Sequence, residues 1–239
     1  DRTLDTRIQN LNFRAEDTVL DGQNVFADAG DNNEVGTAGD DRMFGGAGAD
    51  TLSGQEGDDR LTGGNGGDAL RGGAGGDLLL GSAGDDTVFG DAGRDRLYGQ
   101  AGDDLLEGGL GDDWILGGEG ADTLIGGAGI DRLTGGAGAD IFIFGAPGQG
   151  RDFLRDFDAA DIIAVSAAGF AGLVEGVALT AAQFTVGVAA SGNAAQFIYN
   201  TATGRLLWDT DGTEVGEAQT LALLVPNTAL TLADIIVIA

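Results

Sequence analysis

The sequence contains no cysteine and no histidine among its 239 residues. The absence of cysteine excludes a disulfide framework and any thiolate ligand. The absence of histidine excludes imidazole metal sites, Ser-His and Cys-His catalytic pairs and the HExxH zinc motif. Aromatic residues make up only 6% of the chain. Apolar burial alone is therefore a weak basis for its folding, and something else must contribute.

Positive charge is also scarce, because 12 basic residues, all of them arginine, face 39 acidic ones and leave a formal net charge of -27. Such a surface repels nucleic acid and anionic membranes, so we expect neither as a partner. Cations are the expected partners instead.

Long hydrophobic runs are missing as well. The apolar stretch "DIIVIA" at the end falls far short of the roughly 20 residues that cross a bilayer, and no secretory signal peptide opens the chain. We expect a soluble protein without membrane insertion. The chain begins at Asp1 and its only methionine is Met43, so we also expect it to be part of a longer precursor whose upstream activity lies outside this sequence.

What the sequence does contain is an uninterrupted repeat of nine residues, twelve times over, from residue 36 to residue 143. Position eight of each unit is apolar, from Met43 to Phe142. A disordered glycine-rich linker would not keep four columns fixed over this length, and collagen would need a period of three. Position one is always glycine: Gly36, Gly45, Gly54, Gly63, Gly72, Gly81, Gly90, Gly99, Gly108, Gly117, Gly126 and Gly135. Position four is always glycine: Gly39, Gly48, Gly57, Gly66, Gly75, Gly84, Gly93, Gly102, Gly111, Gly120, Gly129 and Gly138. Position six is always aspartate: Asp41, Asp50, Asp59, Asp68, Asp77, Asp86, Asp95, Asp104, Asp113, Asp122, Asp131 and Asp140.

Each column has a physical reason. A six-residue turn that directs its carbonyl oxygens toward one point needs positive φ angles or close approach of neighbouring chains, and glycine meets both demands. An aspartate at the end of the turn adds a carboxylate, which makes an all-oxygen cage suited to calcium and less suited to magnesium. Positions seven to nine then predict a short strand in which only the middle side chain points inward.

The repeat resembles the RTX nonapeptide, GGxGxDxUx, of calcium-binding secreted proteins. The resemblance implies an all-β fold, a right-handed parallel β-roll in which two nonapeptides form one 18-residue coil. It also implies a calcium ion between the loops of repeats n and n+2, so about ten ions in the roll. The expected site residues are the aspartates and glycines of the three columns. The sequence departs from the motif mainly at position two, where Thr37, Gln55, Ser82, Asp91 and Gln100 replace glycine, and we expect these sites to work because a backbone oxygen is the ligand there.

The repeats divide the chain into three parts. Residues 1–35 form an N-terminal segment, in which residues 28–35 look like a degraded turn of the roll without calcium. Residues 36–143 form the roll, and residues 144–239 predict a β-rich cap that closes its open end. The stretch "DTDGTE" from Asp209 to Glu214 has the opening of an EF-hand loop but lacks the rest, so a hairpin turn is expected. Candidates for one further calcium site in the cap are Asp152, Asp156, Asp158 and Asp161; a solvated acidic loop is the alternative.

Alternate repeats should line opposite faces of the roll, and one face concentrates arginine and aromatic residues. This face is a candidate docking surface for a partner; the alternative is that the N-terminal segment or the cap covers it. Its candidate residues are Arg42, Phe44, Arg60, Arg96, Tyr98 and Trp114.

The expected function is that of a calcium-binding module that folds, stabilises and helps to export a larger extracellular protein. The resemblance implies type I secretion from a Gram-negative bacterium by means of an uncleaved C-terminal signal. Here Asp234 is followed by Ile235, Ile236 and Val237, although Ile238 and Ala239 extend beyond the family pattern; a plain edge strand is the alternative. A module that itself binds polysaccharide or a cell surface remains the second hypothesis, and we expect no catalytic site within this chain.

Overall fold

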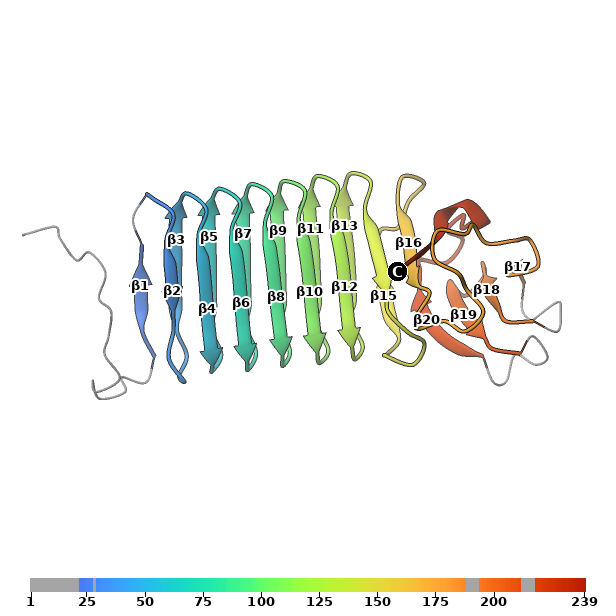
Figure 1. The fold of residues 1–239 in the computed structure, drawn as a ribbon, viewed down its shortest axis with the longest axis horizontal. Helices are drawn as coiled ribbons and strands as arrows, with labels where there is room; N and C mark the ends of the chain where they lie inside the picture. The colour runs from blue at the N-terminus through green and yellow to red at the C-terminus, as the bar shows by residue number, and fades with distance from the viewer. Residues whose placement is uncertain (1–21, 28, 188–193, 212–217) are drawn as a thin grey trace, which may run out of the picture.

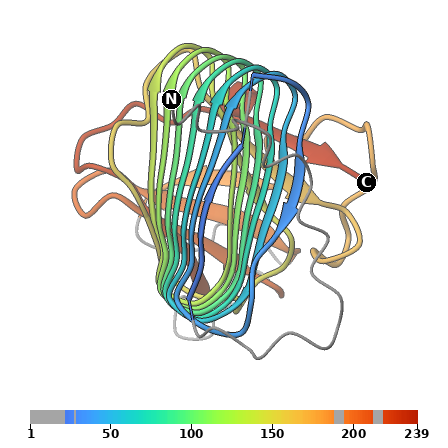
Figure 2. The same cartoon turned by 90° about the vertical axis from the view of Figure 1, so that its left-hand side faces the viewer.

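The computed structural model of the chain describes residues 22–27, 29–187, 194–211 and 218–239. Figure 1 shows a long ladder of strands, from β1 to the cap, whose long axis is also the axis of the molecule. Figure 2 views this ladder from its N-terminal end, where successive coils lie one behind another and their turns stack at two opposite edges. The predicted parallel β-roll is confirmed.

Odd-numbered strands of the roll form one parallel sheet, which we call sheet A. From β1 to β13 each strand pairs in register with the strand 18 residues further on, so that Arg42 lies opposite Arg60 and Arg60 opposite Leu78, whereas β13 pairs with β15 at an offset of 21 residues. The strands of the roll in sheet A are β1 (Asn24–Phe26), β3 (Arg42–Ala47), β5 (Arg60–Asn65), β7 (Leu78–Ala83), β9 (Arg96–Ala101), β11 (Trp114–Glu119), β13 (Arg132–Ala137) and β15 (Asp152–Leu154).

Even-numbered strands form the second parallel sheet, sheet B, which ends at the C-terminal strand of the chain. Alternate repeats therefore do line opposite faces. The strands of sheet B are β2 (Asn33–Val35), β4 (Thr51–Glu56), β6 (Ala69–Ala74), β8 (Thr87–Ala92), β10 (Leu105–Leu110), β12 (Thr123–Ala128), β14 (Ile141–Phe144), β16 (Ile162–Ser166) and β21 (Ile235–Ile238).

The strands are six residues long in most repeats, where the sequence predicted three. Each begins at position seven and continues through positions one to three of the next unit, as in β9. Two positions of each strand are buried, the apolar position eight and the glycine at position one. The strand continues because a glycine at position one keeps its backbone at the interior face without a side chain to place there.

The core of the roll is one column of apolar side chains from each sheet. Leu61, Leu79 and Leu97 are fully buried in sheet A, and Leu52, Leu70 and their successors fill the same place in sheet B. Each coil buries only two large side chains, so that apolar burial per residue is small.

The ladder extends past both predicted boundaries of the roll. On the N-terminal side, β2 shows that the predicted degraded turn at residues 28–35 does form a strand, and β1 adds another one upstream; residues 1–21 and Asp28 lie outside the described residues. On the C-terminal side, β15 and β16 pair in parallel with β13 and β14. The parallel pairing therefore continues into the region predicted as the cap.

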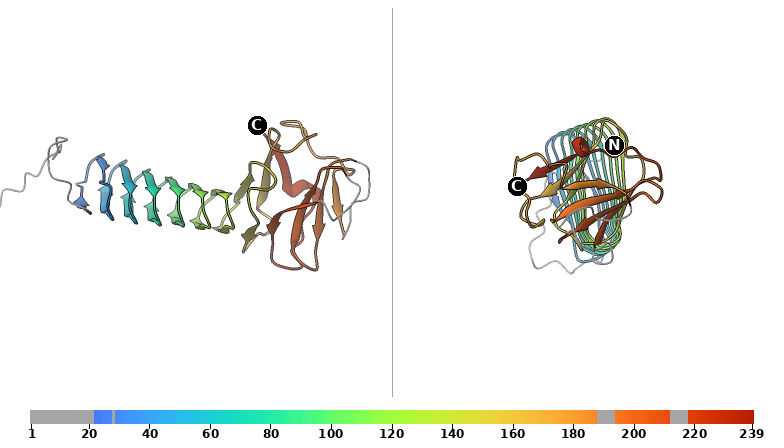
Figure 3. Two further views of the ribbon diagram at one scale, coloured as in Figure 1. Left: turned by 90° about the horizontal axis from the view of Figure 1, so that it is seen from below. Right: turned by 90° about the vertical axis from the view of Figure 1, so that its right-hand side faces the viewer.

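The cap combines antiparallel strands with the last strands of both sheets. It contains β17 (Phe184–Val186), β18 (Gln196–Asn200), β19 (Arg205–Asp209), β20 (Gln219–Leu223) and a short 3-10 helix, η1 (Leu232–Asp234). β18, β19 and β20 are antiparallel neighbours, and β20 pairs in parallel with β15, so they continue sheet A. Phe170, Phe197 and Trp208 pack their rings together at centroid distances of 4.6 to 5.8 Å. Figure 3 shows that the cap is broader than the roll it closes.

The C-terminal strand β21 lies at the edge of sheet B. It pairs in parallel with β16, and Ile235 and Val237 are buried there whereas Ile236 is partly exposed. Asp234 closes the first turn of η1 by accepting the backbone N–H of Thr231. The predicted alternative of an edge strand therefore describes this segment in the folded chain. Among the described residues no helix is long and apolar enough to span a membrane.

Candidate cation sites

The repeat aspartates form two rows, one along each edge of the roll. In each row the carboxylate Oδ1 accepts the backbone N–H of the residue 18 positions earlier, as Asp95 does from Asp77 at 2.8 Å. The N–H of Asp95 in turn donates to Asp113 at 2.8 Å. Each aspartate is thus fixed between the two neighbouring coils of its own row. One row contains Asp41, Asp59, Asp77, Asp95, Asp113 and Asp131, and the other contains Asp50, Asp68, Asp86, Asp104, Asp122 and Asp140.

The second carboxylate oxygen of most repeat aspartates is buried and has no hydrogen-bond partner. This holds for Oδ2 of eleven of the twelve, from Asp50 to Asp140. A buried, unpaired carboxylate oxygen is costly unless a cation or a donor meets it. These oxygens therefore mark places where the fold has left an acceptor for a ligand.

Backbone carbonyl oxygens converge on the same places. A Cβ atom added to Gly45 would lie 2.4 Å from Oδ2 of Asp50 and 2.7 Å from the carbonyl oxygen of Gly63. Gly108 stands in the same relation to Asp113 and Gly126. A side chain at position one would thus fill the space beside the free carboxylate oxygen, which explains why this column is glycine in every repeat.

The glycine at position four meets both of the predicted demands. Gly111 has a φ of +134°, and a Cβ atom there would lie 1.4 Å from the carbonyl oxygen of Gly93. Position two also takes positive φ angles, and four of the five departures from the motif adopt them: Gln55 at 89°, Ser82 at 93°, Asp91 at 72° and Gln100 at 83°. The backbone of the turn therefore keeps its shape where the motif residue is replaced.

The first repeat differs from the others. The exception at position two is Thr37, whose backbone N–H donates to Oδ2 of Asp41 at 2.6 Å. The other oxygen of Asp41 accepts the N–H of Gln23. Upstream, Asn32 occupies position six and donates its side-chain amide to Asp50 at 3.1 Å. The N-terminal coil therefore carries amides where the repeats carry carboxylates, and the absence of calcium at residues 28–35 stays a prediction.

The predicted cap aspartates continue the rows rather than forming a separate cluster. Asp152 accepts the N–H of Asp131, and Asp161 accepts the N–H of Asp140, both at 3.1 Å and both 21 residues on instead of 18. Asp156 accepts the backbone N–H groups of Gly135 and Gly136, at 3.0 and 2.9 Å.

The second oxygen of Asp161 is already engaged. It accepts the N–H of Asp158 at 2.8 Å, and Asp158 accepts the N–H of Ala160 at 2.7 Å. Asp158 and Asp161 therefore offer fewer open lone pairs than the repeat aspartates do.

The predicted hairpin at residues 209–214 follows β19, which pairs with β20 in the antiparallel sense, although Gly212, Thr213 and Glu214 lie outside the described residues.

Burial raises the pKa values of the central aspartates far above the usual range of an aspartate. It raises the pKa of Asp86, Asp95 and Asp122 to about 7; the backbone hydrogen bond lowers this pKa in part, and neighbouring carboxylates of the same row raise it. The pKa values of Asp59 and Asp113 are raised to about 6 for the same reasons. A cation beside Oδ2 would favour the ionised form, so the rows suit a bound cation better than solvent.

The donor set fits calcium. Each place combines a carboxylate oxygen with backbone carbonyl oxygens, a hard all-oxygen set of the kind that calcium prefers, and the turns offer several such oxygens without a rigid octahedron. Among the described residues no group of three or more acidic side chains is arranged to hold a metal ion by itself. Each turn instead places one row carboxylate close to a backbone carbonyl oxygen, as Asp50 lies close to the carbonyl of Gly63, so a cation there would depend on backbone oxygens as well as carboxylates.

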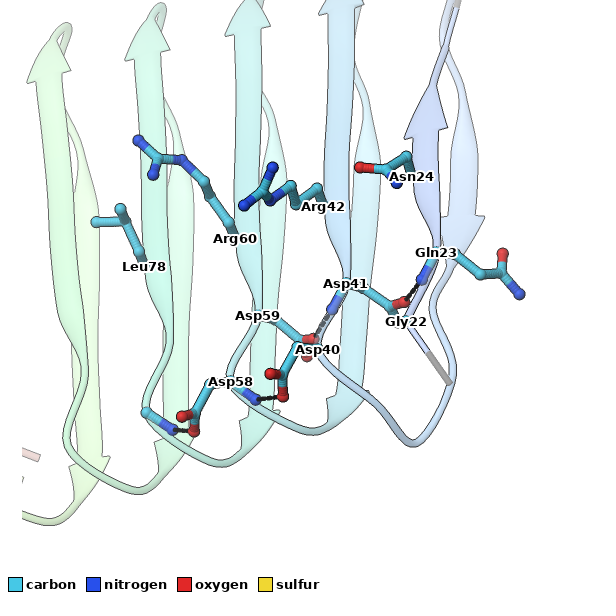
Figure 4. Close-up of a pocket in the computed structure, with 11 residues that line it drawn as sticks. Gly22, Gln23, Asn24, Asp40, Asp41, Arg42, Asp58, Asp59, Arg60 and Leu78 are labelled. Atoms are coloured by element: carbon cyan, nitrogen blue, oxygen red, sulfur yellow. Dashed lines mark hydrogen bonds between the residues drawn. The ribbon is translucent and has the colours of Figure 1, made fainter. Parts of the chain in front are cut away.

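A second set of aspartates, at position five, was not predicted as functional. Asp58 accepts the N–H of Gly76 at 2.8 Å and donates its own N–H to Asp40 at 2.9 Å. These side chains are exposed and join the turns of neighbouring coils from the outside. Figure 4 shows Asp40 and Asp58 along the turns of a groove of about 510 Å³, below the side chains of Arg42 and Arg60. The recurrence of Asp at position five in "GDD" was the available signal.

The predicted docking residues lie on the outward side of sheet A between β3 and β13, which we call the arginine face. Arg42, Arg60 and Arg96 are exposed, Phe44 and Trp114 are 44% and 49% exposed, and Tyr98 is partly buried. The cap therefore does not cover this face. Whether residues 1–21 approach it falls outside the described part of the chain.

Comparison with known protein families identifies the part of the chain that carries the two rows of aspartates. The family model of the RTX calcium-binding nonapeptide repeat (4 copies) matches residues 26–61, 35–70, 62–97, 80–115, 89–124 and 116–146, together more than half of the chain. No curated protein sequence matches the chain.

Solved structures that are similar to this chain include the following two. One is the solution structure of the AlgE6R3 subunit from the Azotobacter vinelandii mannuronan C5-epimerase, 28% identical over 69% of this chain and 80% of that one, with a TM-score of 0.37. The other is the crystal structure of the extracellular lipase LipA from Serratia marcescens, 16% identical over 92% of this chain and 40% of that one, with a TM-score of 0.35. The family match and the paired rows of aspartates lead to one conclusion: this chain belongs to the family of proteins with RTX calcium-binding nonapeptide repeats.

Proposed function

We propose that calcium binding folds this chain, which acts as a folding, stabilising and export module of a larger extracellular protein. The observation that carries the proposal is the set of eleven buried carboxylate oxygens without a partner. In the absence of a cation these oxygens oppose folding, and calcium converts them into ligands. The same residues therefore act against the fold without calcium and in its favour with calcium.

The net charge acts in the same direction. The chain has a formal charge of -27, which about ten divalent ions would reduce to about -7. Extracellular calcium modules bind with dissociation constants of roughly 0.1 to 1 mM, so millimolar calcium adds on the order of 1 kcal/mol per site. About ten sites give about 10 kcal/mol, which is comparable to the whole stability of an ordinary domain.

Circular dichroism with a calcium titration tests the proposal. In a chelator we expect the spectrum of a largely unfolded chain, and in millimolar calcium the full β spectrum and a compact radius of gyration by small-angle scattering. Magnesium at the same concentration is the control and should not restore the fold, because it demands stricter geometry. A full β spectrum in the chelator would refute a calcium-driven fold.

Export is the second element of the proposal. A chain that stays unfolded in a low-calcium cytosol can cross an envelope as a thread and fold outside, by type I secretion from a Gram-negative bacterium. The C-terminal motif at Asp234 supports this route. Its neighbours Ile235 and Val237 are buried in the folded cap, so recognition would have to precede folding.

A secretion assay tests this route. Replacing Ile235 and Val237 by serine should abolish export through a type I apparatus, whereas the same change at the exposed Val174 and Val177 should not. Normal export of the first variant would contradict the signal. We assign no catalysis to the roll or the cap, and any catalytic domain of the precursor would lie upstream.

A second function, recognition of a polysaccharide or a cell surface, is favoured by one observation. The arginine face is exposed on a strongly acidic chain. A glycan-binding assay in saturating calcium tests this function.

A further inference from the structure

The strand positions of the arginine face that point outward carry arginine and no carboxylate. Its exposed arginines are Arg42, Arg60, Arg96 and Arg132, and no acidic residue occupies the outward positions seven, nine and two of β3 to β13. The nearest carboxylates lie in the turns at its edge, where Asp40 and Asp58 line one groove with Arg42 and Arg60 and where Asp112 lies within electrostatic reach of Arg132. In the described part of the chain, the ion pairs are Arg71–Asp91 and Arg94–Asp112, and neither lies on this face.

Sheet B offers a comparison within the same molecule. Its outward side carries one arginine, Arg71, which forms an ion pair with Asp91 at 2.5 Å. Glu107 lies on the same side, between Phe89 and Ile125. The two faces are built from the same repeat, so the exclusion of acidic residues from one of them is a property of that face and not of the fold.

The arginines of the arginine face alternate with apolar side chains. In-register pairing places position seven of successive odd repeats in one straight row along the roll, and Figure 4 shows its start, with Arg42, Arg60 and Leu78 on adjacent strands. From Arg60 onward, charged and apolar residues alternate over six strands. The order is Arg60, Leu78, Arg96, Trp114, Arg132 and Phe153.

The stability of the sheet does not explain this pattern. Alternation separates like charges, which destabilise a sheet when they lie opposite each other. Carboxylates between the arginines would serve that purpose better, in a chain that has 39 acidic residues to place. Arg42 and Arg60, moreover, lie directly opposite each other. The pattern is better explained by an anionic partner that binds from outside.

We propose that the arginine face binds a linear acidic polysaccharide that alternates one carboxylated and one neutral sugar, with its chain along the axis of the roll. The proposal rests on the second function proposed above and specifies its ligand. Strands repeat every ~4.8 Å, so arginines on alternate strands stand ~9.6 Å apart, which is about the length of one extended disaccharide.

The chemistry of the row fits such a chain in detail. A guanidinium binds a carboxylate with two parallel N–H···O bonds, which suits Arg60, Arg96 and Arg132. The flat apolar face of a neutral sugar can pack against Leu78 or Trp114 between them. The six strands from Arg60 to Phe153 cover about 24 Å, enough for a hexasaccharide.

Binding should depend on calcium beyond the need for a folded roll. Each arginine of the row directly follows a row aspartate, as Arg96 follows Asp95. Cations bound in the turns would neutralise the negative potential next to the row, and salt would screen the remaining attraction. Affinity should therefore rise with calcium and fall with added sodium chloride.

Calorimetry with three hexasaccharides on the calcium-loaded chain tests the proposal. The probes are a hyaluronan oligosaccharide, with one carboxylate per disaccharide, a galacturonate oligomer, with one per sugar, and a neutral maltose oligomer. We expect the first to bind at least tenfold more tightly than the other two. Equal binding of the galacturonate oligomer would overturn the match to a disaccharide while leaving glycan recognition intact. If none of the three bound to a chain folded by circular dichroism, both the proposal and glycan recognition would fail.

Substitutions on the two sheets test whether the oligosaccharide binds at the arginine face. Replacing Arg60, Arg96 and Arg132 by glutamine should weaken hyaluronan binding about 30-fold, at roughly threefold for each exposed ion pair. Trp114→Ala should weaken it as well, and Arg71→Gln, the matched change on sheet B, should not. Unchanged binding by the triple variant would refute the proposal even if the oligosaccharide binds elsewhere, and the β spectrum in calcium checks that each variant is folded.

Discussion

Replacing one buried aspartate by asparagine should change stability in opposite directions with and without calcium. Asp95 is the test position, because it lies in the middle of its row, is fully buried and leaves Oδ2 without a partner. Asparagine keeps an oxygen for the N–H of Asp77 but presents an amide where the cation is expected. The loop of Asp95 faces a loop on each side, through hydrogen bonds to Asp77 and Asp113. At about 1 kcal/mol per site, the loss in millimolar calcium is about 2 kcal/mol.

Without calcium the same change should favour the fold. Burial raises the pKa of Asp95 to about 7, so at pH 8 its ionised form destabilises the folded state relative to the unfolded one. Each pKa unit corresponds to about 1.4 kcal/mol, and after half is assigned to solvent screening the relief is about 2 kcal/mol. A calcium-free chain with Asp95→Asn should therefore need less of a stabilising osmolyte to fold than the parent does.

The matched control is Asp85→Asn. Asp85 also accepts one backbone N–H from a residue 18 positions away, that of Asp103 at 2.9 Å, but it is exposed at position five. Both substitutions remove one negative charge, so any difference between them reports the buried site. Urea unfolding, followed by the β signal in circular dichroism, gives the free energies in calcium. Equal effects of Asp95→Asn and Asp85→Asn in calcium, or a loss of stability for Asp95→Asn in both conditions, would refute the assignment of the rows as cation sites.

Three further predictions follow from the same geometry. Because the pKa values of buried aspartates such as Asp86 are raised in the folded state, to about 7, the stability of the calcium-free roll is greatest at acidic pH and is lost as pH rises through 6 to 7. Lowering the pH from 8 to 5 should therefore increase the β signal in a chelator, and a constant spectrum would contradict this. Gly111→Ala, whose Cβ would meet the carbonyl oxygen of Gly93 at 1.4 Å, should cost on the order of 3 kcal/mol in thermal unfolding. Gly76→Ala, whose nearest such contact is 3.3 Å, should cost less than about 1 kcal/mol, so equal losses would disprove the close approach. Leu97→Ala, in the fully buried column, should cost about 2 to 5 kcal/mol, and calorimetry that found less than 1 would show that calcium alone holds the coil.

Most of the roll could be predicted from the sequence, because the nine-residue period of the repeat determines both the strand register and which residues are buried. One strand every nine residues and one coil every 18 follow from the columns, and the in-register pairing of Arg42 with Arg60 is a direct consequence. The same columns indicated which side chain faces the core, as at Leu97. They did not indicate strand length, because position one pairs in the sheet although glycine is a poor predictor of a strand.

The ends of the roll were harder to predict. At the N-terminal end, Gln23 and Asn32 stand at position six, where their backbone N–H groups continue the row without an aspartate, so the aspartate column did not identify the strand β1. At the C-terminal end, three extra residues separate Asp131 from Asp152. This insertion breaks the period although the hydrogen bond is preserved. In both places tertiary pairing outlasts the sequence pattern, because the backbone ladder needs N–H and C=O groups but no particular side chain.

The pairing of each strand with the strand two repeats away restricts how the length of this chain can change. Removal of 18 residues would leave every later strand in its own sheet, with both rows of aspartates and both outer faces intact. Removal of nine would transfer every later strand to the opposite sheet, so that the part of the arginine row beyond the cut would point to the other side of the molecule. The arginine face can therefore lengthen or shorten only in whole coils, and the coil, rather than the nonapeptide, is the unit on which insertion and deletion can act without loss of that face.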